Sequence, residues 1–262
     1  MKSPTTQSYS LDNAWEDARR RLALLERCYD PGTIRRLEAL PVWPGWRCLE
    51  VGGGCGSIAR WLGQRLGARV RVVATDIDTR FLDELDLPNL EVLQHDAVAD
   101  PLPEGEFDLV HARAVLCHLS AREAVLAKLV AALRPGGWLL LEEADCYAQV
   151  ALSDDEYGDM AHWAAEAMRS LGADLTWARH LPTRLGNAGL VDVGAATDAP
   201  LFSGGSPAAE FLQLTFTQLG ERALAAGAPP GLLEQACAAL ADPHRWFPGY
   251  GIVAAWGRRQ VV

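Results

Sequence analysis

Residues 47–57 read Arg-Cys-Leu-Glu-Val-Gly-Gly-Gly-Cys-Gly-Ser, and this stretch decides the fold. The apolar run over 47–51 predicts a short buried strand, and the glycines after it predict a tight turn where backbone can approach a ligand closely. Leucine and isoleucine then recur at helical spacing over 57–66, so the turn leads into a helix. The unpaired N–H groups at the start of such a helix suit a carboxylate or a phosphate.

The spacing of the glycines separates two classes of ligand. A dinucleotide fingerprint, G-x-G-x-x-G, would place its third glycine where Ser57 stands. Here Gly56 comes one residue early, and the acid Glu50 stands two residues before Gly52. A carboxylate at the tip of a strand attracts a ligand that carries positive charge. The turn by itself is also compatible with a simple tight turn, so the acids that follow it matter.

Two further acids follow the next two predicted strands. Asp76 ends a valine-rich strand over 70–76, and Asp96 follows a strand over 90–95. An acid at the end of the second strand of a nucleotide-binding sheet accepts hydrogen bonds from ribose hydroxyls. Ile77 is then suited to pack on adenine, and Asp96 to accept from its amino group. Each aspartate alone has an ordinary alternative as a loop cap. Three acids at three successive strand ends favour a ligand.

The rest of the chain alternates between strand and helix patterns. Further strands are expected over residues 107–111, 138–141, 191–196 and 251–256. Strands that alternate with helices predict a parallel sheet with helices on both faces. Two capping boxes, Ser120–Glu123 and Ser153–Glu156, are expected to open helices by satisfying backbone N–H groups.

Helices are also expected at the N-terminus and late in the chain. An apolar stripe over 11–25 predicts a helix that Pro31 and Gly32 break, with a second short helix over 34–40. Ser206 before Pro207 predicts a helix start, and two helices are expected over 208–226 and 231–242.

Four segments together resemble one known family. The runs LEVGGGCGSIARWL, VVATDID, HDAVADPLPEGEFDLVHARAVLCHL and LRPGGWLLLEEAD resemble class I S-adenosylmethionine-dependent methyltransferases, over residues 9–145. More narrowly, the chain is similar to actinobacterial small-molecule methyltransferases. The resemblance implies an α/β, Rossmann-like three-layer sandwich with a helical cap. Its seven-stranded, mostly parallel sheet would have the order 3-2-1-4-5-7-6, with the last strand antiparallel.

The resemblance also suggests how the chain is divided. We expect residues 1–45 to form an N-terminal helical cap segment. The core would comprise residues 46–200 and 251–262, with a cap helix at 153–172. Residues 201–250 would be a helical insertion that covers the substrate.

The family's cofactor is S-adenosylmethionine, and the resemblance implies which residues hold it. Asp76 would hold the ribose, and Glu50 would face the methionine part together with the backbone of Gly52 and Gly54. The backbone of His111 and Ala112 would meet the amino group. His118 has a structural alternative on the approach to a helix. The full expected set is Tyr9, Glu50, Gly52, Gly54, Gly56, Asp76, Ile77, Asp96, Ala97, His111, Ala112 and His118.

Candidate bases follow the fifth strand. Strand alternation puts Glu142 and Glu143 on opposite faces, and the family position favours Glu143. His111 is a second candidate for catalysis. Metal-dependent catechol methyltransferases carry an Asp-Asn pair after this strand, whereas this chain has Glu142-Glu143-Ala144-Asp145, so no metal is expected.

Composition bounds the partners. The formal net charge of -10 argues against a nucleic-acid or membrane partner, because both surfaces are negative. The six cysteines show no C-x-x-C pair, and the N-terminus shows no apolar leader, so we expect a cytoplasmic protein. The expected acceptor is a small, apolar or aromatic metabolite of secondary metabolism. The oligomeric state stays open, and so do two alternatives, an NAD-dependent reductase and a non-catalytic binding module.

Overall fold

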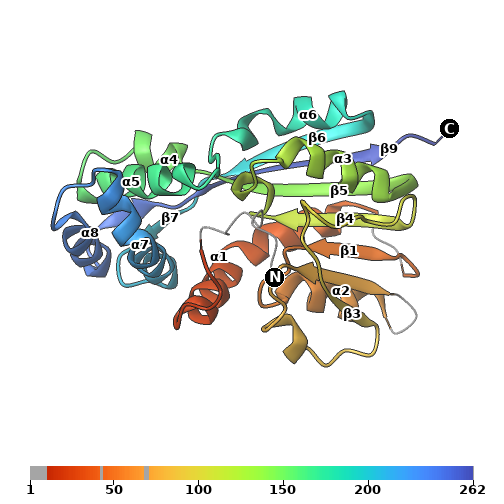
Figure 1. Ribbon diagram of the computed structural model, residues 1–262, viewed down its shortest axis with the longest axis horizontal. Coiled ribbons are helices and arrows are strands. Elements are labelled where there is room, and N and C mark those ends of the chain that lie inside the picture. The colour runs from red at the N-terminus through yellow and green to blue at the C-terminus, as the bar shows by residue number, and fades with distance from the viewer. Residues whose placement is uncertain (1–10, 42–43, 68–70, 262) are drawn as a thin grey trace, which may run out of the picture.

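A seven-stranded sheet forms the centre of the computed structural model, which describes residues 11–41, 44–67 and 71–261 (Figure 1). Its order is β3-β2-β1-β4-β5-β9-β6, and β9 runs antiparallel to both of its neighbours. Since β9 is the seventh strand of this sheet, the expected topology is confirmed. The strands are β1 (Cys48–Val51), β2 (Val72–Asp76), β3 (Leu90–Gln94), β4 (Phe107–Arg113), β5 (Leu133–Asp145), β6 (Leu190–Asp198) and β9 (Gly251–Arg259).

Helices cover both faces of the sheet, as the alternation of side chains along β5 illustrates. Leu140 packs with the second half of α1 and with α2, whereas Leu139 and Leu141 pack with α3 and α6. The helices are α1 (Ala18–Ala39), α2 (Ser57–Leu66), α3 (Arg122–Ala132), α4 (Tyr147–Ala151), α5 (Glu156–Ser170), α6 (Leu181–Asn187), α7 (Pro207–Ala226) and α8 (Leu232–Ala241). Short 3-10 turns are η1 (Leu82–Glu84), η2 (Leu116–His118) and η3 (Trp177–His180).

A helical cap stands at the end of the sheet where β5 leaves and β9 enters, on the left of Figure 1. It contains α4, α5, α7, α8 and a two-stranded ribbon of β7 (Leu201–Ser203) and β8 (Trp246–Pro248). Its core is aromatic, with Tyr157 packed against Phe216 and Phe247. The sequence patterns predicted α5, α7 and α8 of this cap. They predicted neither the five-residue helix α4 nor the ribbon, whose strands are only three residues long.

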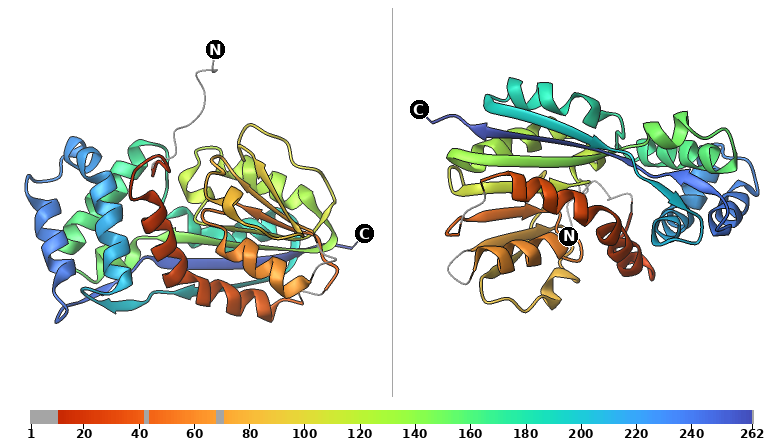
Figure 2. Two further views of the ribbon diagram at one scale, coloured as in Figure 1. Left: turned by 90° about the horizontal axis from the view of Figure 1, so that it is seen from below. Right: turned by 180° about the vertical axis from the view of Figure 1, so that it is seen from behind.

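The expected break at Pro31 is wrong, because α1 continues through that residue. Proline removes one helical hydrogen bond, here to the carbonyl of Arg27, and bends a helix more often than it ends one when both halves are held. Figure 2 shows α1 changing direction along its length. Its second half is held on the sheet because Thr33 and Arg36 both contact Glu142.

The two predicted capping boxes are also wrong in detail. The N-cap of α3 is Ala121, without a side-chain cap, and Glu123 instead accepts a hydrogen bond from Trp177 Nε1 at 2.8 Å. The N-cap of α5 is Asp155, which accepts from a backbone N–H of the first turn. The cap predicted at Ser206 is confirmed for α7. At α3, the carboxylate that the capping box would have used is engaged instead by Trp177, a partner far away in the sequence.

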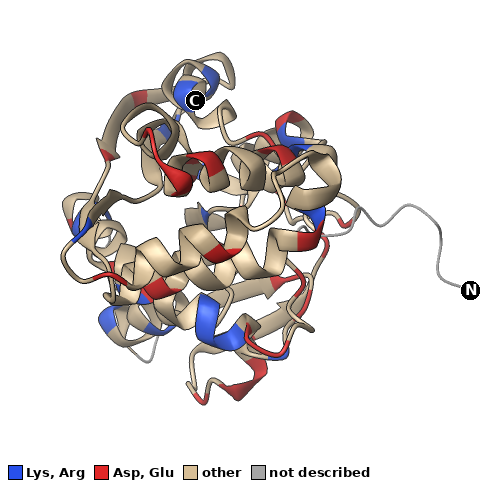
Figure 3. Cartoon of the chain, turned by 90° about the vertical axis from the view of Figure 1, so that its left-hand side faces the viewer, with Lys and Arg blue, Asp and Glu red and all other residues tan. Residues whose placement is uncertain are grey.

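The surface carries charges of both signs. Figure 3, which views the cap end, shows acidic and basic segments interspersed around the chain. All six cysteines are free thiols. Within the described residues, no helix combines the length and the apolar character needed to cross a bilayer.

Candidate functional site

A cavity of about 670 Å³ lies between the sheet and the cap. We call one side the sheet wall; it is built from residues 50–55, 75–77, 95–99 and 113–115, where β1 to β4 end. We call the other side the cap wall. It is built from Leu11, Asn13, Arg21, Leu22, Leu25, Glu26, Tyr29, Met168, Leu171, Leu175, Phe211, Thr215 and Tyr250.

The glycine turn gives the sheet wall its shape. Gly52 has a φ of +69°, and a Cβ there would lie 2.3 Å from Cγ2 of Val115, so no other residue fits. Gly54 also has a positive φ, but a Cβ there would meet only Leu22, at 3.8 Å. The backbone at Gly54 is therefore open toward the cavity, as the close approach of a ligand requires.

Asp76 lies beside this turn at the end of β2. Its Oδ2 accepts from the backbone N–H of Gly54 at 3.1 Å, and its Oδ1 accepts from the N–H of Asp78 at 3.1 Å. Burial raises the pKa of Asp76, while these backbone hydrogen bonds oppose the rise. Ile77 follows with 37% of its surface exposed and also lines the cavity. Both residues occupy the places expected from the sequence.

The loop after β3 brings Asp96 and Ala97 to the same wall. Asp96 Oδ1 accepts from the N–H groups of Val98, at 2.8 Å, and Ala99, at 3.2 Å. Asp96 therefore caps its own loop, which is the ordinary alternative that the sequence left open. Lys128 reinforces the loop by donating to the carbonyls of Ala97 and Val98, at 3.0 and 2.7 Å.

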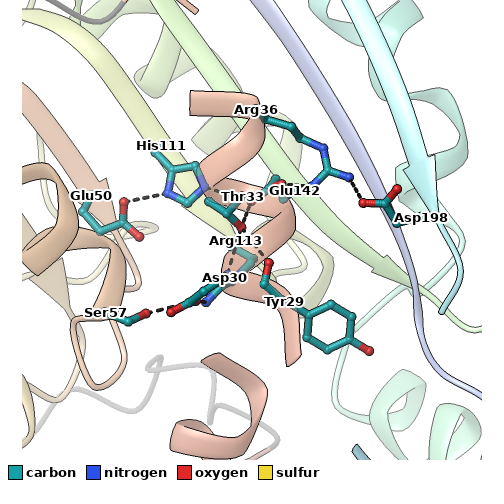
Figure 4. A network of polar contacts seen from close by, with 10 residues as sticks. All are labelled: Tyr29, Asp30, Thr33, Arg36, Glu50, Ser57, His111, Arg113, Glu142 and Asp198. Atoms are coloured by element: carbon teal, nitrogen blue, oxygen red, sulfur yellow. Dashed lines mark hydrogen bonds and ion pairs between the residues drawn. The ribbon is translucent and has the colours of Figure 1, made fainter. Parts of the chain in front are cut away.

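Behind the sheet wall, His111 bridges two carboxylates (Figure 4). Its Nδ1 lies 2.6 Å from Glu50 Oε2 and its Nε2 lies 3.2 Å from Glu142 Oε2. Burial works against the charged imidazole, but the two carboxylates outweigh it and raise the pKa of His111 to about 9. The charged His111 in turn helps to hold the pKa of Glu142 below its usual value, against the effect of burial.

The same network reaches α1. Glu142 accepts from Arg36 Nη1 at 2.6 Å, and Arg36 also pairs with Asp198. Arg113, at the end of β4, donates to Thr33 Oγ1 at 2.9 Å and to Asp30 Oδ1 at 2.8 Å. These contacts fix the bent helix α1 against the strand ends that form the site (Figure 4).

The two expected catalytic groups lie away from the cavity lining, which corrects the sequence-based expectation. Glu143 is fully buried, and its carboxylate accepts from the N–H groups of Leu116 and Cys117, both at 3.0 Å. His111 is also fully buried, with both ring nitrogens engaged. Glu143 therefore holds η2 in place, and His111 holds Glu50.

Three other residues were expected to contact the cofactor, and the structure describes two of them. Ala112 is fully buried and does not line the cavity, and the contact expected from its backbone stays a prediction. His118 does line the cavity, and burial together with the charges of Arg21 and Arg122 lowers its pKa to about 4. Its imidazole is therefore neutral at neutral pH. Tyr9 lies outside the described residues.

At the start of α2, a backbone N–H group is bound by a side chain of this chain. The sequence suggested that its free N–H groups await an anionic ligand, but Glu26 Oε1 accepts from the N–H of Ser57 at 3.1 Å. Ser57 Oγ also donates to Asp30 Oδ1 at 3.1 Å. Both acids come from α1, so this contact depends on tertiary packing that no local pattern reveals.

Sequence reasoning missed the polar residues of the cap wall, most clearly Arg21. It lines the cavity, and only 1% of its surface is exposed. A signal was present, because Arg21 follows Ala18 by three positions and precedes Leu22, on the apolar stripe of α1. A charge within such a stripe is unusual and indicates either a buried ion pair or a ligand contact.

Comparisons with known proteins agree with this architecture. Residues 49–141 match the family model described as a methyltransferase domain. The chain is 30% identical over 156 residues to methyltransferase str3 of Strobilurus tenacellus, covering 55% of this chain and 52% of that protein. It is 32% identical over 115 residues to the ubiquinone/menaquinone biosynthesis C-methyltransferase UbiE of Ectopseudomonas mendocina (strain ymp), covering 41% and 45%. The chain thus spans about half the length of these curated relatives.

Solved structures share the fold at low identity. Phosphoethanolamine N-methyltransferase 2 of Haemonchus contortus, with phosphomonomethylethanolamine and S-adenosylhomocysteine bound, aligns with a TM-score of 0.63 at 15% identity, covering 98% of this chain and 61% of that chain. A putative methyltransferase from Bacillus halodurans C-125 aligns with a TM-score of 0.59 at 17% identity, covering 88% and 99%. The cyclase SpnF aligns with a TM-score of 0.54 at 21% identity, covering 90% and 82%.

Proposed function

Because residues 49–141 form a class I S-adenosylmethionine-dependent methyltransferase domain, we propose that the protein methylates an O, N or C atom of a small metabolite. The metabolite would be largely apolar or aromatic, of the kind made in secondary metabolism. The observation that carries this proposal is the cavity of about 670 Å³. One of its walls offers acids at strand ends, and the other offers apolar and aromatic side chains.

The sheet wall fits S-adenosylmethionine in chemistry and in shape. When bound, this cofactor supplies an electrophilic methyl group on a positively charged sulfur. Asp76 would accept from the ribose hydroxyls, and Ile77 and Asp96 would lie against the adenine. Glu50, held by His111, would place negative charge near the positively charged part of the cofactor. The open backbone at Gly54 leaves room for close approach.

The cap wall would position the acceptor. Leu25, Met168 and Phe211 offer apolar contact, while Tyr29 and Tyr250 keep phenol groups in the wall. Burial raises the pKa of both tyrosines, so they stay protonated and act as hydrogen-bond donors. Holding the acceptor in line in a cavity that excludes water supplies much of the rate of such a transfer. When the acceptor atom is a phenol or hydroxyl oxygen, its proton must also be passed to a base as the new bond to carbon forms.

The two alternatives make different predictions about ligands. An NAD-dependent reductase is disfavoured by the early third glycine and by Glu50 before the turn. The fold does not decide between a methyltransferase and a non-catalytic module, because one fold can carry different activities, as the cyclase SpnF illustrates. A binding measurement therefore has to be followed by a turnover measurement.

Calorimetry with S-adenosylhomocysteine tests the proposal first. We expect saturable binding that millimolar NAD does not displace, and absence of binding at millimolar S-adenosylhomocysteine would contradict the proposal. Turnover is then measured as S-adenosylhomocysteine released from S-adenosylmethionine with a panel of phenols, amines and carbon acids. Binding without any turnover across this panel would favour the non-catalytic module instead.

A further inference from the structure

The cap wall contains a buried cation, Arg21, that forms no ion pair with any of the described residues. Arg21 is 1% exposed, and its Nε and Nη2 have no hydrogen-bond partner in the structure. No ion pair joins it to any acid among residues 11–41, 44–67 and 71–261. The remaining residues of the chain include no Asp or Glu. The protein therefore offers Arg21 no acidic side chain of its own.

The other buried arginines near the cavity behave differently. Arg36, with 11% of its side chain exposed, pairs with Glu142 and Asp198. Arg113, with 8% exposed, pairs with Asp30. Burying a guanidinium without a partner is costly, and arginine cannot lose its proton to escape that cost. The contrast indicates that the partner of Arg21 comes from outside the chain.

The two unpaired nitrogen atoms of Arg21 indicate which chemical group it would bind. Nε and Nη2 are adjacent donors on one edge of the guanidinium, and such an edge binds the two oxygens of a carboxylate side by side. Leu22, Leu25 and Phe211 line the same cavity, so a carboxylate held by Arg21 would belong to a molecule that also has apolar parts. The charge of Arg21 helps to lower the pKa of His118 and opposes the rise in the pKa of Tyr250, so Arg21 lies near both residues.

We propose that Arg21 binds a carboxylate of the methyl acceptor, so that the substrates are apolar or aromatic acids. This inference rests on the proposed function and names its substrate class. S-adenosylmethionine also carries a carboxylate, which is a second source of the same chemistry. The acceptor is favoured because Arg21 belongs to the cap wall, where Leu22 and Leu25 of the same helix also line the cavity.

The main experiment compares acids with their neutral counterparts. Binding of 4-hydroxycinnamate and its methyl ester, and of decanoate and decanol, is measured by calorimetry with S-adenosylhomocysteine saturating. The variants are Arg21→Met, Arg21→Lys and, as a matched control on the exposed side of α1, Arg27→Met. We expect at least one acid to bind wild type about tenfold tighter than its neutral counterpart, since a charged hydrogen-bonded pair is lost in the neutral one.

The variants locate this preference. Arg21→Met should remove the preference and leave the affinity of the neutral probe unchanged, Arg21→Lys should keep part of it, and Arg27→Met should resemble wild type. The thermal midpoint of Arg21→Met should equal or exceed that of wild type, because a buried unpaired charge has been removed. A purely structural role for Arg21 predicts the reverse, a lower midpoint with the acid preference intact, and would overturn the proposal.

Further results of the binding measurements would show which part of the proposal is wrong. If both members of each pair bind wild type alike, whether well or not at all, the carboxylate assignment is overturned. The same holds if decyl phosphate binds better than decanoate. If Arg21→Met weakens S-adenosylhomocysteine tenfold but spares 5′-methylthioadenosine, which lacks the carboxylate, Arg21 serves the methyl donor. If wild type does not bind S-adenosylhomocysteine, the proposed function itself fails.

Discussion

The two walls of the cavity are built on different principles. On the sheet wall and behind it, acids are paired: Asp76 accepts from backbone N–H groups, and Glu50 is held by His111. The cap wall is mostly apolar and contains Arg21, whose guanidinium has two donors without acceptors. The acids Asp76 and Glu50 of the sheet wall have protein partners, whereas the cation of the cap wall is paired with no acid among the described residues.

We infer from this difference that the sheet wall holds its ligand in a fixed orientation, whereas the cap wall selects which acceptor binds. Groups fixed by backbone hydrogen bonds at strand ends hold a ligand in one orientation without reorganising. A wall of side chains from α1, α5 and α7 is set by helix packing, so its shape can vary while the sheet stays the same. We therefore expect substitutions behind the sheet wall to affect stability or cofactor binding, and those on the cap wall to affect the acceptor.

The largest effect should come from breaking the support behind the sheet wall. His111→Ala would leave Glu50 and Glu142 buried without the cation between them, and we expect the free energy of unfolding to fall by about 3–5 kcal/mol. Urea denaturation at pH 7 measures it. His244→Ala, at an exposed histidine, is the control. Equal losses in the two variants would mean that the buried network does not stabilise the fold.

The pH dependence of the free energy of unfolding should reflect the protonation of His111. The pKa of His111 rises from 6.5 to about 9 on folding, so its stabilisation is complete below pH 6.5 and is lost as the pH rises through 9. The expected loss in wild type is roughly 3 kcal/mol over that interval. Urea denaturation at several pH values measures it, with His111→Ala as the control that should lack this slope. A wild-type stability independent of pH between 6.5 and 9 would contradict a charged His111.

A smaller effect is expected for the sheet wall itself. Asp76→Ala should weaken S-adenosylhomocysteine binding by about 1–3 kcal/mol, because the ribose hydroxyls would lose a buried acceptor. Asp78→Ala is the matched control, since its side chain is engaged with Arg80 while its backbone N–H would be kept. Calorimetry measures both. Equal affinities in wild type and Asp76→Ala would remove Asp76 from the ribose role.

The smallest effect is expected on the cap wall. Thr215 is buried in α7, and its hydroxyl donates to the carbonyl of Phe211 at 2.8 Å. Thr215→Val removes the hydroxyl and keeps the shape, so the affinity for S-adenosylhomocysteine should change by less than about twofold. A tenfold loss in the same calorimetric titration would show that the two walls do not act separately.

Most of the sheet and its ligand-facing edge followed from short stretches of sequence. The strand, glycine turn and helix at 47–66 appear as expected, and Asp76, Ile77 and Asp96 line the cavity. These features are local, because parallel strands place their carboxyl ends at one edge whatever lies between them. The supporting role of Glu143 was not accessible in this way, since its partners, Leu116 and Cys117, lie on another segment.

By itself, the sequence determined the succession of the seven sheet strands and of the longer helices between them, the glycine turn and the acids beside it. Backbone conformation and hydrophobic periodicity act over a few residues, so these features are local. Only the tertiary structure decided which partners the other charged side chains have. It carried α1 through Pro31, placed Glu26 on the start of α2, joined His111 to two carboxylates and left Arg21 without one. Each outcome depends on which side chains far apart in the chain share a buried space, since burial makes every unpaired charge costly.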